Sequence, residues 1–141
     1  MLFRSKASII LVVNCTKATR TIAAIVKGCQ TFDPDLTIAG VVLNNVAGKR
    51  HQKIITDTIE EFCNIPVLGA IPKLGKDAEL IPGRHLGLIP PSEFVSAPEL
   101  TKKLEEIAEN YLDIDELLSL AKNNNSLADR KSTRLNSSHR L

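Results

Sequence analysis

The sequence predicts an α/β fold in which a parallel sheet carries helices on both faces. Three short apolar runs rich in β-branched residues alternate with two segments whose apolar residues recur at helical spacing. Strands that alternate with helices in this way form parallel sheets joined by right-handed crossovers. The 141 residues, of which 43% are hydrophobic, are enough for about one domain with a buried core.

The first half of the chain is expected to form a βαβαβ unit. Ser8–Val13 is an apolar run without polar alternation, as in a strand buried on both faces. The next elements are expected in this order: a helix at about Ala18–Lys27, a strand at Leu36–Leu43, a helix at about Arg50–Cys63 and a strand at Pro66–Ile71. Because a single helix joins each strand to the next, the three strands are expected to be neighbours in one parallel sheet.

The second half is expected to contain a loop and two helices. A segment rich in Gly and Pro runs from Pro72 to Pro91, and its short apolar stretch Leu86–Ile89 is a candidate for a last strand. Two pairs of residues with capping-box spacing mark the starts of the helices: Ser96 with Glu99, and Asp113 with Glu116.

Both ends of the chain resemble translated sequencing adapters. The tail from Asp129 to His139 matches the in-frame translation of one adapter residue for residue, and Met1–Ser5 matches its partner adapter when GTG serves as the initiator. We therefore expect residues 1–5 and 129–141 to be adapter-derived and to pack against nothing. The natural sequence, a partial ATP-binding domain by the resemblance described below, is expected within residues 6–128.

The charge of the chain does not indicate a nucleic-acid partner. Without the charges of the two ends, residues 6–128 carry 13 Lys+Arg against 15 Asp+Glu, a net of −2 in place of +2 for the whole chain. No apolar run approaches the roughly 20 residues of a membrane-spanning helix, and no secretory signal stands at the amino end. We expect a cytoplasmic protein that binds neither nucleic acid nor membranes.

The cysteines and histidines do not form a metal site. Cys15, Cys29 and Cys63 are odd in number and contain no C-x-x-C pair, so we expect reduced, structural thiols. His51 and His85 each lack a second ligand at metal-binding spacing. Without a G-x-S-x-G motif or a paired nucleophile and base, no catalytic residue is assigned.

Polar residues follow the expected strands at the edge where open parallel sheets bind ligands. Asn14 follows the first strand, Asn44 and Asn45 follow the second, and Pro72 and Lys73 follow the third. An asparagine amide offers both donors and an acceptor, which matches the edge of an adenine ring, and Asn44 is the best placed. Asparagine is also a common turn former, so both interpretations of Asn44 stay open.

Gly48, Lys49 and Arg50 precede an expected helix start, where backbone N–H groups and the helix dipole favour an anion. A solvated pair of cations is the alternative. The G-x-x-x-x-G-K-[ST] motif is absent from the chain, so a phosphate contact here would be secondary.

Several strings resemble cobyrinic acid a,c-diamide synthases in order and spacing. They are the run from Ile10 to Arg20, Phe32–Asp35, Ile38–Asn44, Arg50–His51, Ile65–Pro72 and Arg84–Leu88. Each string is weak alone, but together they stand in register over about Ile9 to Pro91. The family usually has Asp where this chain has Asn14, so any polar or metal-linked role of that position needs testing.

The resemblance implies a truncated P-loop NTPase fold of the dethiobiotin-synthetase type. It also implies an ATP- and Mg²⁺-dependent amidoligase that phosphorylates corrinoid carboxylates and amidates them with ammonia from glutamine, in a possible homodimer. By the same resemblance Asn44 sits at the adenine and Pro72 beside the base, and Arg50 and Arg84 are further candidate nucleotide contacts. The family's P-loop lysine and glutaminase residues have no matching positions, so the fragment alone is expected to be inactive.

Three alternative functions remain open from the sequence. The first is a related amidotransferase, such as cobyric acid synthase or a nickel-tetrapyrrole a,c-diamide synthase. The second is a partitioning-type P-loop ATPase, against which the Arg84–Leu88 string argues. The third is a non-enzymatic regulatory domain like those attached to phosphate acetyltransferases.

Overall fold

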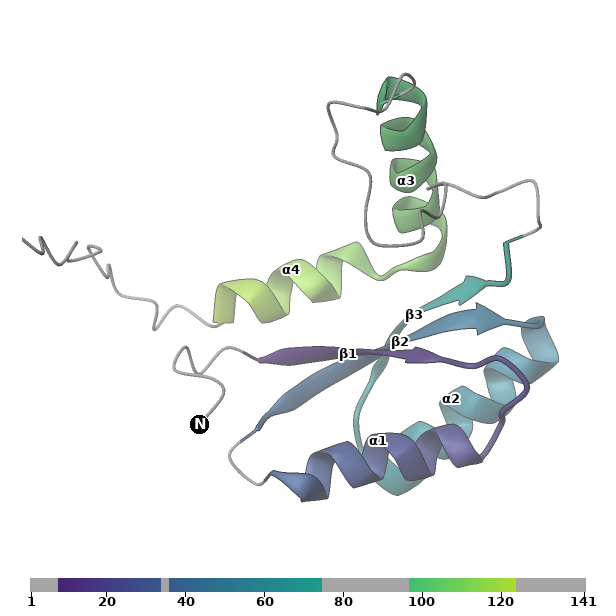
Figure 1. Ribbon diagram of the computed structural model, residues 1–141. Coiled ribbons are helices and arrows are strands. Elements are labelled where there is room, and N and C mark those ends of the chain that lie inside the picture. The colour runs from purple at the N-terminus through teal and green to yellow at the C-terminus, as the bar shows by residue number, and fades with distance from the viewer. Residues whose placement is uncertain (1–7, 34–35, 75–96, 124–141) are drawn as a thin grey trace, which may run out of the picture.

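A computed structural model describes residues 8–33, 36–74 and 97–123 (Figure 1). The elements in these ranges are β1 (Ile9–Asn14), α1 (Thr21–Phe32), β2 (Ile38–Val46), α2 (Lys49–Cys63), β3 (Val67–Pro72), α3 (Ala97–Tyr111) and α4 (Ile114–Asn123). The strands form one parallel sheet in the order β1-β2-β3. The prediction of three neighbouring parallel strands is therefore confirmed.

The element boundaries differ most from the predicted ones at α1 and β2. Helix α1 begins at Thr21 and not at Ala18, because the preceding turn contains Lys17 in the left-handed region, with φ of 55°. Strand β2 continues beyond Leu43 to Val46. The ladder extends because the Cys15 N–H donates to the Asn44 carbonyl at 2.7 Å and the Lys73 N–H to the Val46 carbonyl at 3.0 Å.

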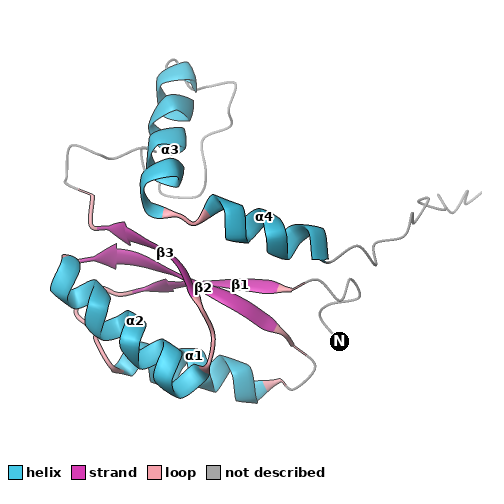
Figure 2. Cartoon of the chain, turned by 180° about the vertical axis from the view of Figure 1, so that it is seen from behind, coloured by secondary structure: helices cyan, strands magenta, loops and turns pink. Residues whose placement is uncertain are grey.

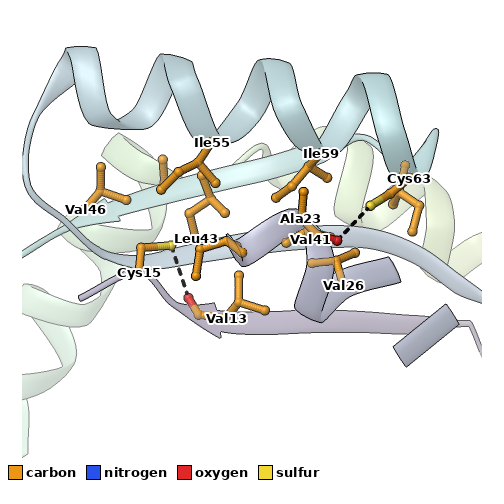
Figure 3. Packing of buried hydrophobic residues seen from close by; sticks show 13 residues of the cluster. Val13, Cys15, Ala23, Val26, Val41, Leu43, Val46, Ile55, Ile59 and Cys63 are labelled. Carbon is orange, nitrogen blue, oxygen red and sulfur yellow. Dashed lines mark hydrogen bonds between the residues drawn. The ribbon is translucent and has the colours of Figure 1, made fainter. Parts of the chain in front are cut away.

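The core lies between the sheet and the two crossover helices, which cover the same face (Figure 1). Leu43 from β2 and Ile55 and Ile59 from α2 are almost completely buried there (Figure 3). Ile22 from α1 is equally buried. Ile55 and Ile59 are one turn apart on the buried side of α2, which is the apolar spacing that predicts a helix from the sequence. Burying a side chain of this size contributes about 1.5–3 kcal/mol.

Helices α3 and α4 lie on the opposite side of the sheet, as both views show (Figures 1 and 2). Helices thus occupy both sides as predicted, but the carboxyl-terminal pair, and not a crossover helix, forms the second layer. The corner between α3 and α4 attaches to β3 through an antiparallel bridge between Gly69 and Leu112. The Asp113 N–H also donates to the Leu68 carbonyl at 2.8 Å.

The second predicted capping box forms in part. The Glu116 N–H donates to Asp113 Oδ1 at 3.0 Å, which caps the first turn of α4. In a complete capping box the Glu116 side chain would accept a hydrogen bond from the Asp113 N–H. Here the Leu68 carbonyl of β3 accepts that hydrogen bond instead. Tertiary contact therefore replaces half of the local motif.

Some predictions fall outside the described residues. These are the candidate strand Leu86–Ile89, the cap residue Ser96, the candidate contact Arg84, and the expected adapter-derived segments 1–5 and 129–141. In the ranges that are described, no helix combines the length and apolar character needed to cross a membrane.

Candidate functional site at the carboxyl edge of the sheet

The three strands end together and bring the predicted site residues to one edge. Asn14 of β1 is the register partner of Asn44 of β2, and Val46 of β2 is the partner of Pro72 of β3. The asparagines belong to the strands and do not follow them, which corrects the predicted boundary. The edge itself is the one expected for ligand binding in an open parallel sheet.

Asn14 accepts three hydrogen bonds at one oxygen. Its Oδ1 accepts from the Thr16 N–H at 3.1 Å, from the Thr16 hydroxyl at 2.8 Å and from Asn45 Nδ2 at 3.2 Å. An aspartate presents the same oxygen to the same donors. Asn14 therefore makes every acceptor contact that an aspartate could make here.

Asn44 has its amide oriented by the backbone of the next residue. Asn44 Oδ1 accepts from the Asn45 N–H at 2.9 Å, and the side chain is half-buried. This bond leaves a second lone pair on Oδ1. In the described part of the chain, no protein group accepts from Asn44 Nδ2. Within the described residues, both N–H donors of Nδ2 and one acceptor lone pair of Oδ1 therefore remain available to a ligand.

Asn45 makes the bulge that ends β2. Its φ of 61° lies in the left-handed region, which asparagine tolerates better than most residues. The register between β2 and β3 shifts between Leu43 and Val46 at this point. A bulge bends its strand, so this one changes the direction of β2 directly after Asn44.

Helix α2 begins at the same edge with basic residues. Its N-cap is Gly48, with φ of 154°, a conformation that residues with a Cβ rarely adopt, and no side chain caps the first turn. Lys49 and Arg50 follow and are exposed. The ion pair found on α2 joins Lys53 Nζ to Asp57 Oδ2 at 3.0 Å. Within the described part of the chain, Arg50 forms no ion pair with a carboxylate.

His51 is the residue of this edge that sequence reasoning missed. From the sequence it has no contact role beyond the rejected metal site and its place in the Arg50–His51 string, yet both ring nitrogens are within hydrogen-bond distance of backbone groups in two loops. The available sequence signal was its position as the third residue of α2, after an N-cap glycine that has no side chain to cap the helix. That position is where a side chain turns back to bond the preceding backbone.

Two of the three thiols are buried in the core, as predicted for structural cysteines (Figure 3). Cys15 Sγ is 3.6 Å from the Val13 carbonyl, and Cys63 Sγ is 3.3 Å from the Ala23 carbonyl. Burial raises the pKa of the Cys15 thiol, and a backbone hydrogen bond with Asn44 partly offsets this. Burial also raises the pKa of the Cys63 thiol, against a smaller opposing effect of the Lys27 charge.

The remaining features do not add a ligand set. The described residues contain no cluster of three or more His, Cys, Asp or Glu that would hold a metal ion. A hollow of about 410 Å³ lies beside β3, between α2 and the end of α3, and none of the predicted site residues lines it. The candidate site is therefore the carboxyl edge formed by β1, β2 and the start of α2.

A parallel sheet that brings amide side chains and a helix N-terminus to its carboxyl edge is the arrangement at which α/β domains bind nucleotides. The chain belongs to the family of CobQ/CobB/MinD/ParA nucleotide binding domains, whose sequence profile matches residues 5–89. No solved structure matches the chain.

Curated relatives named cobyrinate a,c-diamide synthase are similar to most of the chain. The protein of Magnetococcus marinus is 43% identical over 116 residues, which are 82% of this chain and 24% of the relative. That of Listeria innocua is 38% identical over 127 residues, 90% of this chain and 28% of the relative. That of Archaeoglobus fulgidus is 38% identical over 116 residues, which are 82% of this chain and 25% of the relative. The chain thus spans about a quarter of the length of these relatives.

Proposed function

We propose that the chain is part of the ATP-binding domain of a cobyrinate a,c-diamide synthase, an ATP-dependent amidoligase that uses glutamine. The supporting observation is the carboxyl edge of the sheet, where no described residue uses the Nδ2 donors or the second Oδ1 lone pair of Asn44. The similarity to curated proteins named cobyrinate a,c-diamide synthase, at 38–43% identity over most of the chain, supports this reaction class. The substrates are then a corrinoid carboxylate and glutamine.

In this proposal Asn44 holds the edge of the adenine ring. Its Nδ2 donates to a ring nitrogen of the base, and the second lone pair of Oδ1 accepts from the exocyclic amine. Pro72 lies beside the base, two positions along the ladder from Asn44. Arg50 and Arg84 supply positive charge toward the nucleotide, and Asn14 fixes the end of β1.

The residues present fit an adenine nucleotide but not a Mg²⁺ ion. Mg²⁺ prefers carboxylate and water oxygens, whereas the described part of the edge offers amides and cations. The printed sequence also lacks the glycine-rich phosphate motif. We therefore assign the triphosphate and Mg²⁺ to residues outside this chain, in the longer enzyme, and expect the chain alone to be inactive.

The decisive experiment compares nucleotide affinity with and without the Asn44 amide. The test protein is the full-length Magnetococcus marinus relative in which residues 9–123 of this chain replace the aligned segment, here called the hybrid synthase. Asn44→Ala removes a hydrogen-bonding group worth roughly 1–3 kcal/mol. ATP affinity, measured by calorimetric titration, should fall about five- to a hundredfold.

The control is Asn110→Ala, which makes the same chemical change on an exposed residue of α3. It should leave the dissociation constant of ATP unchanged. If Asn44 is only a strand-end residue, Asn44→Ala will lower stability slightly and keep both the ATP affinity and the preference for ATP over GTP. That result would remove Asn44 from the nucleotide site.

The related functions are separated by the substrate that stimulates turnover. A synthase should release ADP faster when its corrinoid acid and glutamine are both present. A nickel-tetrapyrrole or cobyric acid amidotransferase would respond to its own tetrapyrrole instead. A partitioning-type ATPase would respond to none of these compounds, and the similarity to named synthases argues against it.

A further inference from the structure

His51 bonds with two loops that follow different strands. The Ala47 N–H, between β2 and α2, donates to His51 Nδ1 at 3.0 Å. His51 Nε2 lies 2.7 Å from the carbonyl oxygen of Ala18, between β1 and α1. Because its two nitrogens contact different loops, the ring bridges them. The residue is half-buried.

The chemistry of the two partners determines the protonation of the ring. A backbone N–H only donates, so Nδ1 facing Ala47 must carry a lone pair. A carbonyl oxygen only accepts, so Nε2 facing Ala18 must carry the hydrogen. Both bonds form together only in the neutral ring with its proton on Nε2.

Non-glycine residues with left-handed backbone lie in or beside both loops that His51 joins. Lys17 has φ of 55° in the first loop, and Asn45, with φ of 61°, precedes the second. Such conformations persist only where the surrounding structure holds them in place. In the described residues, the other bonds that join the end of β1 to the end of β2 are Asn45 Nδ2 to Asn14 Oδ1 and the Cys15 N–H to the Asn44 carbonyl. These bonds lie at the strand ends, whereas His51 reaches from the first turn of α2.

We propose that His51 is a positioning residue that clamps the loop between β1 and α1 to the loop between β2 and α2. The clamp fixes the start of α2 and the Asn14 end of β1 relative to Asn44, and through them the nucleotide site. Its effect on nucleotide affinity rests on the proposed function, but the clamp itself does not. The bond to Ala18 is the part that crosses between the loops.

A purely local cap would need only the first of the two bonds. In a capping box the third helical residue accepts from the N-cap N–H, and here it accepts from the residue before the cap. A short amide side chain would serve that purpose. The imidazole adds a donor on the far side of a rigid ring, and that donor faces Ala18.

Two amide substitutions separate the bonds. In His51→Asn the amide oxygen takes the place of Nδ1 and keeps the bond from Ala47, but the bond to Ala18 is lost. In His51→Gln the amide nitrogen takes the place of Nε2 and keeps the bond to Ala18, but the acceptor for Ala47 is lost. His51→Phe keeps the ring shape and loses both.

Hydrogen exchange of the hybrid synthase, followed by mass spectrometry, reads the two loops separately. In His51→Asn, peptides covering residues 15–20 should exchange about two- to tenfold faster while residues 47–51 keep wild-type rates. In His51→Gln the pattern should reverse. ATP affinity should fall by a similar factor in His51→Asn and stay close to wild type in His51→Gln.

The outcomes distinguish the clamp from the proposed function. Unchanged exchange at residues 15–20 in His51→Asn would overturn the clamp and leave a local cap. If no ATP binds even to the wild-type hybrid, the proposed function fails, while the reversed exchange pattern still supports the clamp. If His51→Phe does not fold, the two amide variants still decide. Nitrogen-15 shifts of the wild-type imidazole give an independent check, since a protonated Nδ1 would contradict the assigned tautomer.

Discussion

Asn45 Nδ2 donates to Asn14 Oδ1 at 3.2 Å and so joins the ends of β2 and β1 across the carboxyl edge of the sheet. The bond depends on the left-handed backbone of Asn45, which bulges β2 at this point. Its acceptor is the oxygen that also receives both donors of Thr16. A single side-chain oxygen therefore organises the loop after β1 and its contact with β2.

The first prediction concerns the chemistry of position 14. Asn14→Asp keeps the oxygen acceptor, so the free energy of unfolding should stay within about 1 kcal/mol of wild type. Asn14→Leu removes all three bonds and should cost about 1–3 kcal/mol. Urea unfolding of the hybrid synthase measures both values. Equal destabilisation by Asp and Leu would show that the amide nitrogen, and not Oδ1, is the important group.

The strands and the buried helix faces could be predicted from the sequence because their signals are local. Ser8–Val13 and Pro66–Ile71 differ from β1 and β3 by one residue at each end. Apolar runs and helical spacing report which residues avoid water, and this is most of what determines a buried strand. The end of β2 was missed because a bulge depends on the φ of Asn45, which no periodicity reveals.

The candidate site was predictable in its location but not in its contacts. The rule for parallel sheets placed Asn14, Asn44 and Pro72 at one edge, and the strand register confirms that they share it. The contacts of His51 were not predictable, since Ala18 is 33 residues away in the chain. The attachment of the α3–α4 corner to Gly69 is equally non-local.

The second prediction compares three glycines. A Cβ at Gly69 would lie 2.7 Å from the Tyr111 carbonyl oxygen, so Gly69→Ala must displace backbone and should cost about 1–3 kcal/mol. A Cβ at Gly40 would come too close to Cδ1 and Cγ of the buried Leu68 side chain, so Leu68 must shift. A side chain gives way more readily than backbone, so Gly40→Ala should cost less than Gly69→Ala.

The matched control for these substitutions is Gly28→Ala. Gly28 lies within α1, and a Cβ there would meet nothing within 4 Å. This change should stabilise the protein by about 0.5–1 kcal/mol through helix propensity. Denaturant unfolding should therefore rank the variants, from most to least stable, as Gly28→Ala, Gly40→Ala and Gly69→Ala. A Gly69→Ala variant as stable as wild type would contradict the packing of the α3–α4 corner on β3.

The third prediction concerns the cap of α4. Asp113→Ala removes the acceptor for the Glu116 N–H and should cost about 0.5–2 kcal/mol, whereas Asp113→Asn should retain most of the stability. Asp115→Ala is the control, because Asp115 is also acidic and in the first turn but lies after the cap. It should cost no more than about 0.3–1 kcal/mol through the helix dipole. Equal losses in the two alanine variants would argue against a capping role for Asp113.

The last prediction is a fall in stability at alkaline pH that originates in Cys15 and Cys63. Burial raises the pKa of both thiols above the ordinary value of 9.0, so the folded protein keeps protons that the unfolded chain releases. The contribution of the neutral thiols is fully present below that ordinary value. As pH rises from it through the folded-state pKa, the free energy of unfolding should fall by at most about 1.4 kcal/mol per pH unit for each thiol.

The measurement is urea unfolding of the hybrid synthase between pH 7 and pH 10.5, with and without Cys15→Ala and Cys63→Ala. The substitutions also remove buried sulfur, which should lower stability by an amount independent of pH. All other side chains are the same in both proteins, so their contribution to the pH dependence cancels in the difference. The difference in unfolding free energy between the two proteins should be flat up to the ordinary thiol pKa and should shrink above it. Parallel curves across the whole range would show that the two thiols are not protected from ionisation in the folded state.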